Sequence, residues 1–225
     1  MPFFEKDSDL RKNWWTTYRD QLWLDLSTPL LLHVACYLGF VSWVVAILSK
    51  KSWMPRLHKL VDKKNKNGQT ALHWAVDGGN EAVVRLLVDR GADINAKSNN
   101  GWTALHQAAA RGHEAMVRLL VDCGANVNAK NNDGWTALHW PAEGLNKAMV
   151  QLLVDCGADV NAKNNNGWTA LHWKAAGGHE AWVRLLVDRG ADINAKNNDG
   201  WTALYRAAAR GHEAVVRLLK SAGAS

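Results

Sequence analysis

The amino-acid sequence predicts an all-α solenoid, and two observations support this fold class. A unit of 33 residues recurs along most of the chain, marked by glycines at equal intervals, and Thr-Ala-Leu begins two positions after each glycine. The glycines are Gly68, Gly101, Gly134, Gly167 and Gly200. Each unit also carries apolar residues with a helical period, separated by turn residues. Such units stack because none buries its apolar face alone, and a stack offers an extended surface without a built-in active site.

The unit at residues 99–131 shows the expected elements in order. An Asn-Asn-Gly turn opens the unit, and Thr103 then caps a first helix that ends at Gly112. A second helix is expected from about His113 to Cys123, because its apolar residues form one broad face. The glycine that follows ends this helix, and an extended loop leads into the next unit.

These units resemble ankyrin repeats. In the third unit, a Gly-Trp-Thr-Ala-Leu-His run begins at Gly134 and a Gly-Ala-Asp-Val-Asn-Ala run begins at Gly157. The family motif has proline where this unit has Ala137, and Tyr205 replaces the motif histidine in the last unit. The resemblance implies five regular repeats, at residues 66–98, 99–131, 132–164, 165–197 and 198–225, and one degenerate N-terminal repeat.

The resemblance also implies a function. We expect a non-enzymatic scaffold or adaptor that binds another protein on the concave face of the stack. No small-molecule substrate and no cofactor are expected, and the protein is expected to be monomeric. The repeated motif Gly-Trp-Thr-Ala-Leu-His-Trp is similar to motifs in the ankyrin arrays of fungal proteins, in which such arrays are joined to NACHT-type signalling ATPases. A regulatory fragment of such a protein is therefore one alternative, although no nucleotide-binding loop occurs in this sequence.

An uncharged stretch near the N-terminus has two interpretations. Leu30 to Leu48 contain no charged residue, and about 20 apolar residues suffice to form a membrane-spanning helix. A membrane-tethered protein with a span near residues 30–48 is therefore a further alternative, although a membrane association is not favoured.

The favoured interpretation is a degenerate capping repeat at residues 28–50. Aligning His33 with His73 places Gly39 on the glycine that separates the two helices of the first regular unit. Gly39 is then a turn between two helices. Residues 1–27 are rich in tryptophan and are expected to form a helical cover over this repeat, since terminal repeats need one.

Residues 51–65 form a basic connector. The segment from Lys50 to Lys66 contains seven lysines and arginines and one acidic residue, Asp62. The net charge of this segment, +6, equals that of the whole chain. Such a segment attracts nucleic acid, anionic lipid or an acidic partner, or it is simply a solvated link between two packed parts. We favour the link, so nucleic-acid binding is not expected.

The histidines do not predict a metal site. One histidine recurs per unit, at His73, His106, His139 and His172. Zinc needs four ligands about 2 Å from one ion, whereas neighbouring units lie about 8–10 Å apart. The family resemblance instead implies that these histidines bond to the backbone of the neighbouring loop. No catalytic motif occurs in the sequence, so neither catalytic nor metal-binding residues are assigned.

The three cysteines are expected to be free thiols. Cys123 and Cys156 occupy equivalent positions in neighbouring units, so their separation of about 8–10 Å exceeds the roughly 7 Å that a disulfide bridges. Free thiols are typical of a reducing compartment, and we expect a cytoplasmic or nuclear protein.

Tryptophan is the most informative residue type, with 13 in the chain. One column of equivalent positions follows the loop glycine and reads Gln69, Trp102, Trp135, Trp168 and Trp201. A second column follows the motif histidine or tyrosine and reads Trp74, Gln107, Trp140, Trp173 and Arg206. Exposed aromatic residues are typical of binding hot spots, although packing between units is the alternative for both columns. The candidate partner-binding residues are Trp102, Trp135, Trp168, Trp201, Gln69, Gln107, Arg206 and Arg111.

Two neighbouring units depart from the repeat. Pro141 interrupts the first helix of the third unit, and Leu145 replaces the glycine that separates the helices elsewhere. In the fourth unit, Lys174 occupies a position that is alanine in other units, which buries an ammonium unless its stem reaches outward. These residues mark either a hinge or decay of the repeat, and for a hinge we expect faster amide exchange at residues 136–146.

Overall fold

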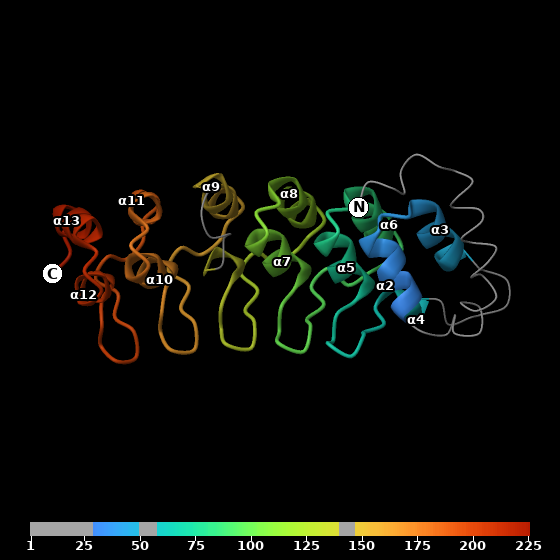
Figure 1. Ribbon diagram of the computed structural model, residues 1–225, viewed down its shortest axis with the longest axis horizontal. Coiled ribbons are helices and arrows are strands. Elements are labelled where there is room, and N and C mark those ends of the chain that lie inside the picture. The colour runs from blue at the N-terminus through green and yellow to red at the C-terminus, as the bar shows by residue number, and fades with distance from the viewer. Residues whose placement is uncertain (1–28, 50–57, 140–146) are drawn as a thin grey trace.

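The computed structural model describes residues 29–49, 58–139 and 147–225, and every regular element in these residues is helical. Figure 1 shows two rows of helices along one long axis, with the connecting loops projecting together from one side. The first helices are α5 (Ala71–Asp77), α7 (Ala104–Ala110), α10 (Ala170–Ala176) and α12 (Ala203–Ala209). The second helices are α6 (Glu81–Asp89), α8 (Glu114–Asp122), α9 (Lys147–Asp155), α11 (Glu180–Asp188) and α13 (Glu213–Ser221). The predicted all-α solenoid is confirmed.

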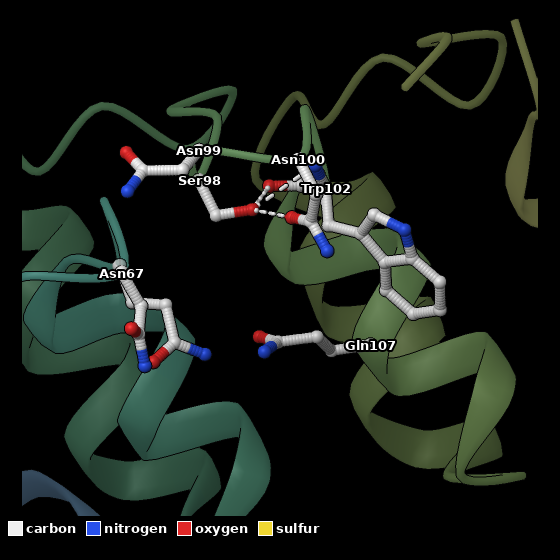
Figure 2. Close-up of a pocket in the computed structure, with 7 residues that line it drawn as sticks. Asn67, Ser98, Asn99, Asn100, Trp102 and Gln107 are labelled. Carbon is white, nitrogen blue, oxygen red and sulfur yellow. Dashed lines mark hydrogen bonds between the residues drawn. The ribbon is translucent and has the colours of Figure 1, made fainter. Parts of the chain in front are cut away.

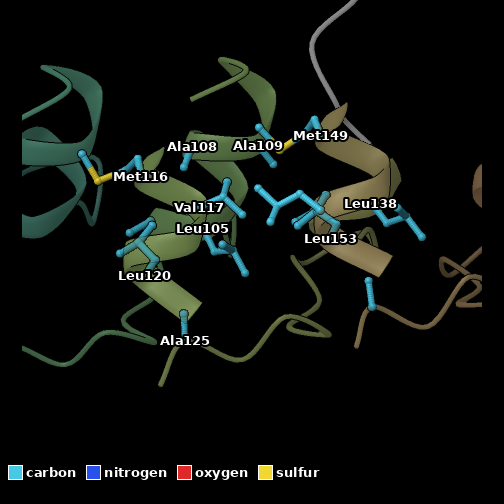
Figure 3. Close-up of a cluster of buried hydrophobic side chains, with 14 of the residues drawn as sticks. Leu105, Ala108, Ala109, Met116, Val117, Leu120, Ala125, Leu138, Met149 and Leu153 are labelled. Carbon is cyan, nitrogen blue, oxygen red and sulfur yellow. The ribbon is translucent and has the colours of Figure 1, made fainter. Parts of the chain in front are cut away.

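The second helix of each unit forms because its apolar residues face the core. In α8, Met116, Val117 and Leu120 are buried while Arg118 is exposed, and α8 begins and ends one residue inside the predicted limits of His113 and Cys123. The equivalent residues of α9, Met149, Val150 and Leu153, are buried in the same way. Figure 3 shows Met116, Val117 and Leu120 with Met149 and Leu153 in one cluster of buried side chains. Each large side chain contributes about 1.5–3 kcal/mol on burial, so the units stabilise one another.

The N-terminal part contains a further helix pair, α2 (Pro29–Tyr37) and α3 (Val41–Ser49), followed by the short α4 (His58–Val61). Gly39 lies between the pair with φ of 71°, close to the 70° of Gly79 in the first regular unit. Helix α2 packs against α5, and α3 packs against α6. The uncharged stretch from Leu30 to Leu48 therefore forms two helices instead of one. Among the described residues, no helix combines the length and the apolar character needed to cross a membrane.

Several predictions concern residues outside the described ranges. Residues 1–27, expected to form the Trp-rich cover, and much of the basic connector at residues 51–65 belong to this group. The limits assigned to the capping repeat at residues 28–50 and to the five regular units stay predictions.

The third and fourth units depart from the repeat sequence, and the structure describes only the departure in the fourth unit. In the third unit, the described residues before position 140 form a 3-10 helix, η1 (Ala137–His139), and both Pro141 and Leu145 lie outside the described residues. In the fourth unit, α10 continues through Lys174, which is only 3% exposed. The Lys174 ammonium lies 4.7 Å from the ring centre of Trp182. Its stem therefore points inward and does not reach out to solvent.

Candidate partner-binding face

The first helices α5, α7 and α10 each begin with a threonine–histidine cap that also contacts the next loop. In α7, the Thr103 backbone N–H donates to His106 Nδ1 at 3.2 Å, and the Thr103 hydroxyl lies 2.8 Å from the same nitrogen. Because Nδ1 accepts, the proton sits on Nε2, which donates to the backbone carbonyl of Trp135 at 3.0 Å. The histidine of one unit thereby holds the loop tryptophan of the next unit, as the family resemblance implied.

The same bond recurs along the stack. His33 Nε2 lies 2.9 Å from the carbonyl of Gln69, and His73 and His172 make the equivalent bonds to Trp102 and Trp201 at 3.0 Å. His139 departs from the pattern, since its Nε2 has no hydrogen-bond partner within the part of the chain that the structure describes. Of the first column, Gln69, Trp102, Trp135 and Trp201 are therefore anchored through their backbone carbonyls, which leaves their side chains for other contacts.

Burial keeps these histidines neutral. Desolvation lowers the pKa of His73, His106 and His172 below its ordinary value. It lowers the pKa of His139 to about 4 from an ordinary 6.5. A neutral imidazole is what the cap requires, because a protonated Nδ1 would lose its role as acceptor for the threonine.

Asparagine and lysine side chains tie the loops to one another. Asn131 Oδ1 accepts from the backbone N–H of Trp135 at 2.8 Å, which shapes the loop within its own unit. Asn132 Nδ2 donates to the carbonyl of Asn99 at 2.8 Å, and Lys97 Nζ donates to the carbonyl of Lys130 at 2.7 Å. Both bonds recur between later units. The sequence analysis missed these residues, although their recurrence every 33 residues was a signal for a structural role.

Aromatic side chains of the last three units form one connected surface, here called the aromatic strip. It consists of Trp135, Trp168, Trp173, Trp201 and Tyr205, together with the guanidinium of Arg206. The Trp173 ring centre lies 5.4 Å from that of Trp135 and 6.0 Å from that of Trp168, both edge-on. Trp201 and Tyr205 stack with ring centres 5.5 Å apart. Residues from the loops and from the first helices thus form a single array.

Arg206 joins the two halves of the aromatic strip. Its guanidinium carbon lies 4.5 Å from the ring centre of Trp168 and 5.1 Å from that of Trp201. Two cation–π contacts hold the planar group between the indoles. The array also reaches the surface, because Trp173 is 39% exposed, Trp201 is 36% exposed and Tyr205 is 52% exposed. Large exposed aromatic side chains that touch one another offer a patch for a partner.

The first two units present a different, polar surface. A hollow of about 350 Å³ is lined by Asn67, Gln69, Ser98, Asn99, Asn100, Trp102 and Gln107. Figure 2 shows Gln107 pointing toward the loop residues from its helix. Ser98 Oγ bonds to Asn100 Oδ1 at 2.5 Å, so part of the polar lining is already ordered. Amide groups of this kind offer both donors and acceptors to a peptide backbone.

The eight candidate residues therefore fall into three sets. Trp135, Trp168, Trp201 and Arg206 lie in the aromatic strip, and Gln69, Trp102 and Gln107 line the polar hollow. Arg111 instead pairs with Asp77 of the preceding unit, with 2.9 Å between Nε and Oδ1. Trp140 of the second column lies outside the described residues. Trp173 and Tyr205 were not among the eight candidates, although Trp173 belongs to the second column and Tyr205 replaces the motif histidine.

The acidic, histidine and cysteine side chains of the described residues give no sign of a metal site. Within the described ranges, the acidic, histidine and cysteine side chains gather in no group suited to a metal ion. The three cysteines are free thiols, and burial raises the pKa of Cys36 to about 12.

Comparison with known proteins identifies the repeat. A family model described as "Ankyrin repeats (3 copies)" matches residues 20–98, 94–164 and 144–225. The chain is 41% identical over 70 residues to NF-kappa-B inhibitor alpha of Homo sapiens, 40% to that of Sus scrofa and 41% to that of Mus musculus. The matched segment is 31% of this chain and 21% of each relative, so the chain spans about a fifth of the length of the curated relatives it matches.

Proposed function

Because this chain belongs to the ankyrin-repeat family, we propose that it is a protein-binding scaffold that engages a partner through the aromatic strip and the adjoining polar hollow. The observation that carries the proposal is the exposure of Trp173, Trp201 and Tyr205 within one connected aromatic array. Interface hot spots are enriched in tryptophan, tyrosine and arginine, and this array contains all three.

The stack is suited to binding because it is already ordered. The histidine, asparagine and lysine bonds between neighbouring loops hold the candidate side chains on a fixed backbone. A preformed surface loses little conformational entropy when a partner docks, so more of the contact energy appears as affinity. The proposed mechanism is therefore rigid presentation of side chains, without chemical change in the partner.

The relatives support the class of partner. Their name describes an inhibitor of another protein. From this name we infer that the partner of this chain is also a protein. We further propose that the chain is a non-enzymatic, monomeric adaptor of the cytoplasm or nucleus.

The proposal is tested by changing Trp135 and Trp168 to Ala together. Proximity labelling and cross-linking mass spectrometry in the native cell would record the partners of the wild-type and variant chains. We expect the double variant to lose the partners that the wild-type chain captures, because it removes two indoles from the aromatic strip. Arg184→Ala is the matched control, since this exposed residue lies on α11 and pairs only with Glu180 of the same helix. Unchanged capture by a folded double variant would overturn the proposal.

A further inference from the structure

We infer that the aromatic strip takes one kind of ligand: an extended, proline-rich peptide segment that carries a carboxylate. This inference rests on the proposed function and narrows it to a chemical class of partner. It is carried by the spacing of the rings and by the unpaired charge of Arg206.

The spacing of the indoles suits a peptide that repeats every three residues. Trp168 and Trp201 both lie against Arg206, at 4.5 and 5.1 Å, so their ring centres are within about 10 Å of each other. Trp135 and Trp168 both contact Trp173, at 5.4 and 6.0 Å, which places them within about 11 Å. A polyproline II segment rises about 3.1 Å per residue with three residues per turn, so its side chains on one face recur about every 9 Å. Every third residue would therefore meet an equivalent ring.

A polyproline II segment also suits the chemistry of the strip. Proline rings are compact apolar groups that pack on aromatic faces, and the segment is stiff before it binds, so little entropy is lost. The exposed faces of Trp173, Trp201 and Tyr205 supply the aromatic surface.

Arg206 is the reason to expect a carboxylate in the peptide ligand. Four of the nine described arginines, Arg111, Arg184, Arg189 and Arg217, have a carboxylate partner within 4 Å. Arg206 pairs with no carboxylate in the described residues, and its buried Nε has no hydrogen-bond partner there. Neighbouring Arg210 adds a second cation, whose guanidinium donates to the carbonyl of Ala176. A guanidinium between two indoles binds a planar carboxylate well, because the fork geometry matches and the rings exclude water.

The test uses a synthetic twelve-residue peptide made of four Pro-Pro-Glu units as the probe. Binding to the full chain would be followed by isothermal titration calorimetry and by intrinsic tryptophan fluorescence. Four Gly-Gly-Glu units keep the charge but lose the stiff conformation, and four Pro-Pro-Gln units keep the conformation but lose the charge. On the protein, Arg206→Gln removes the cation, and Arg184→Gln is the control on the outer helix.

We expect saturable binding of the Pro-Pro-Glu peptide that is weaker by about tenfold or more for both control peptides and for Arg206→Gln, and unchanged for Arg184→Gln. If Arg206→Gln fails to fold, the two control peptides still decide the inference. Absent binding, or equal binding of all three peptides, would overturn it. The proposed function would then still stand if the Trp135 and Trp168 double variant loses its partners in the cell, since those partners would lack such a segment.

Discussion

The buried histidines predict that the stack is destabilised by mild acid, and His139 gives the magnitude. In the unfolded chain its imidazole titrates near the ordinary 6.5, whereas burial lowers the pKa in the folded chain to about 4. Between these values the unfolded state binds more protons than the folded state, so stability falls as the pH falls. The stabilising contribution is complete above about pH 6.5 and is lost progressively toward pH 4.

The size of the loss follows from the two pKa values. A difference of about 2.5 pH units corresponds to about 3 kcal/mol of unfolding free energy lost by pH 4, at about 1.4 kcal/mol per unit. The pKa of His73, His106 and His172 is shifted in the same direction, so their losses add to this one. The carboxyl of Asp155 titrates in a different window, because the Arg189 side chain lowers its pKa below the ordinary 3.8.

Two measurements check this prediction. Proton NMR of the imidazole Hε1 signals should show His139 still neutral at pH 5.5, while urea unfolding at pH 7 and pH 4.5 should show the loss of stability. His139→Leu is the matched variant, because it removes the titrating group; its stability should depend less on pH than that of the wild type. A folded-state His139 signal that titrates near 6.5, or the same pH dependence in both proteins, would refute the reasoning.

Three further predictions concern the local structure. Thr103→Val should lower the free energy of unfolding, measured in urea, by about 1–2 kcal/mol, because it removes the helix cap. Thr202→Val should lower it less, since no histidine bonds to that threonine. Gly39→Ala should lower the melting temperature more than Gly91→Ala, since both have positive φ but only a Cβ at Gly39 would collide with a neighbouring side chain; equal shifts would contradict this. Amide exchange should be faster at residues 136–146 than in the same region of the second unit; equal protection would argue against a hinge.

The regular units were predictable because their signals are local. Thr103 precedes its helix by one residue, and the glycines that end the helices have positive φ, which few other residues adopt. The pairing of His33 with His73 also located the two N-terminal helices, since the same bond from the histidine to the next loop recurs there. Each of these features depends on residues only a few positions apart or on the 33-residue period.

The candidate site was predictable only in part. The columns identified Trp135 and Trp168, but the list of candidate residues also included Arg111, which pairs with Asp77 of the preceding unit. The contact of Trp173 with both of these tryptophans joins two different columns and two different units. A repeat period places residues in columns, but it does not give the side-chain rotamers that bring two columns together.

For the described helix pairs, the sequence by itself determined their order along the chain, because caps, glycine turns and apolar periodicity act within one unit. The tertiary structure decided where side chains lie relative to neighbouring units. Lys174 points inward onto Trp182, and Arg206 lies between the Trp168 and Trp201 rings. The physical reason is that a helix forms from backbone bonds a few residues apart, whereas the direction of a long side chain depends on which rings and carbonyls the next unit places beside it.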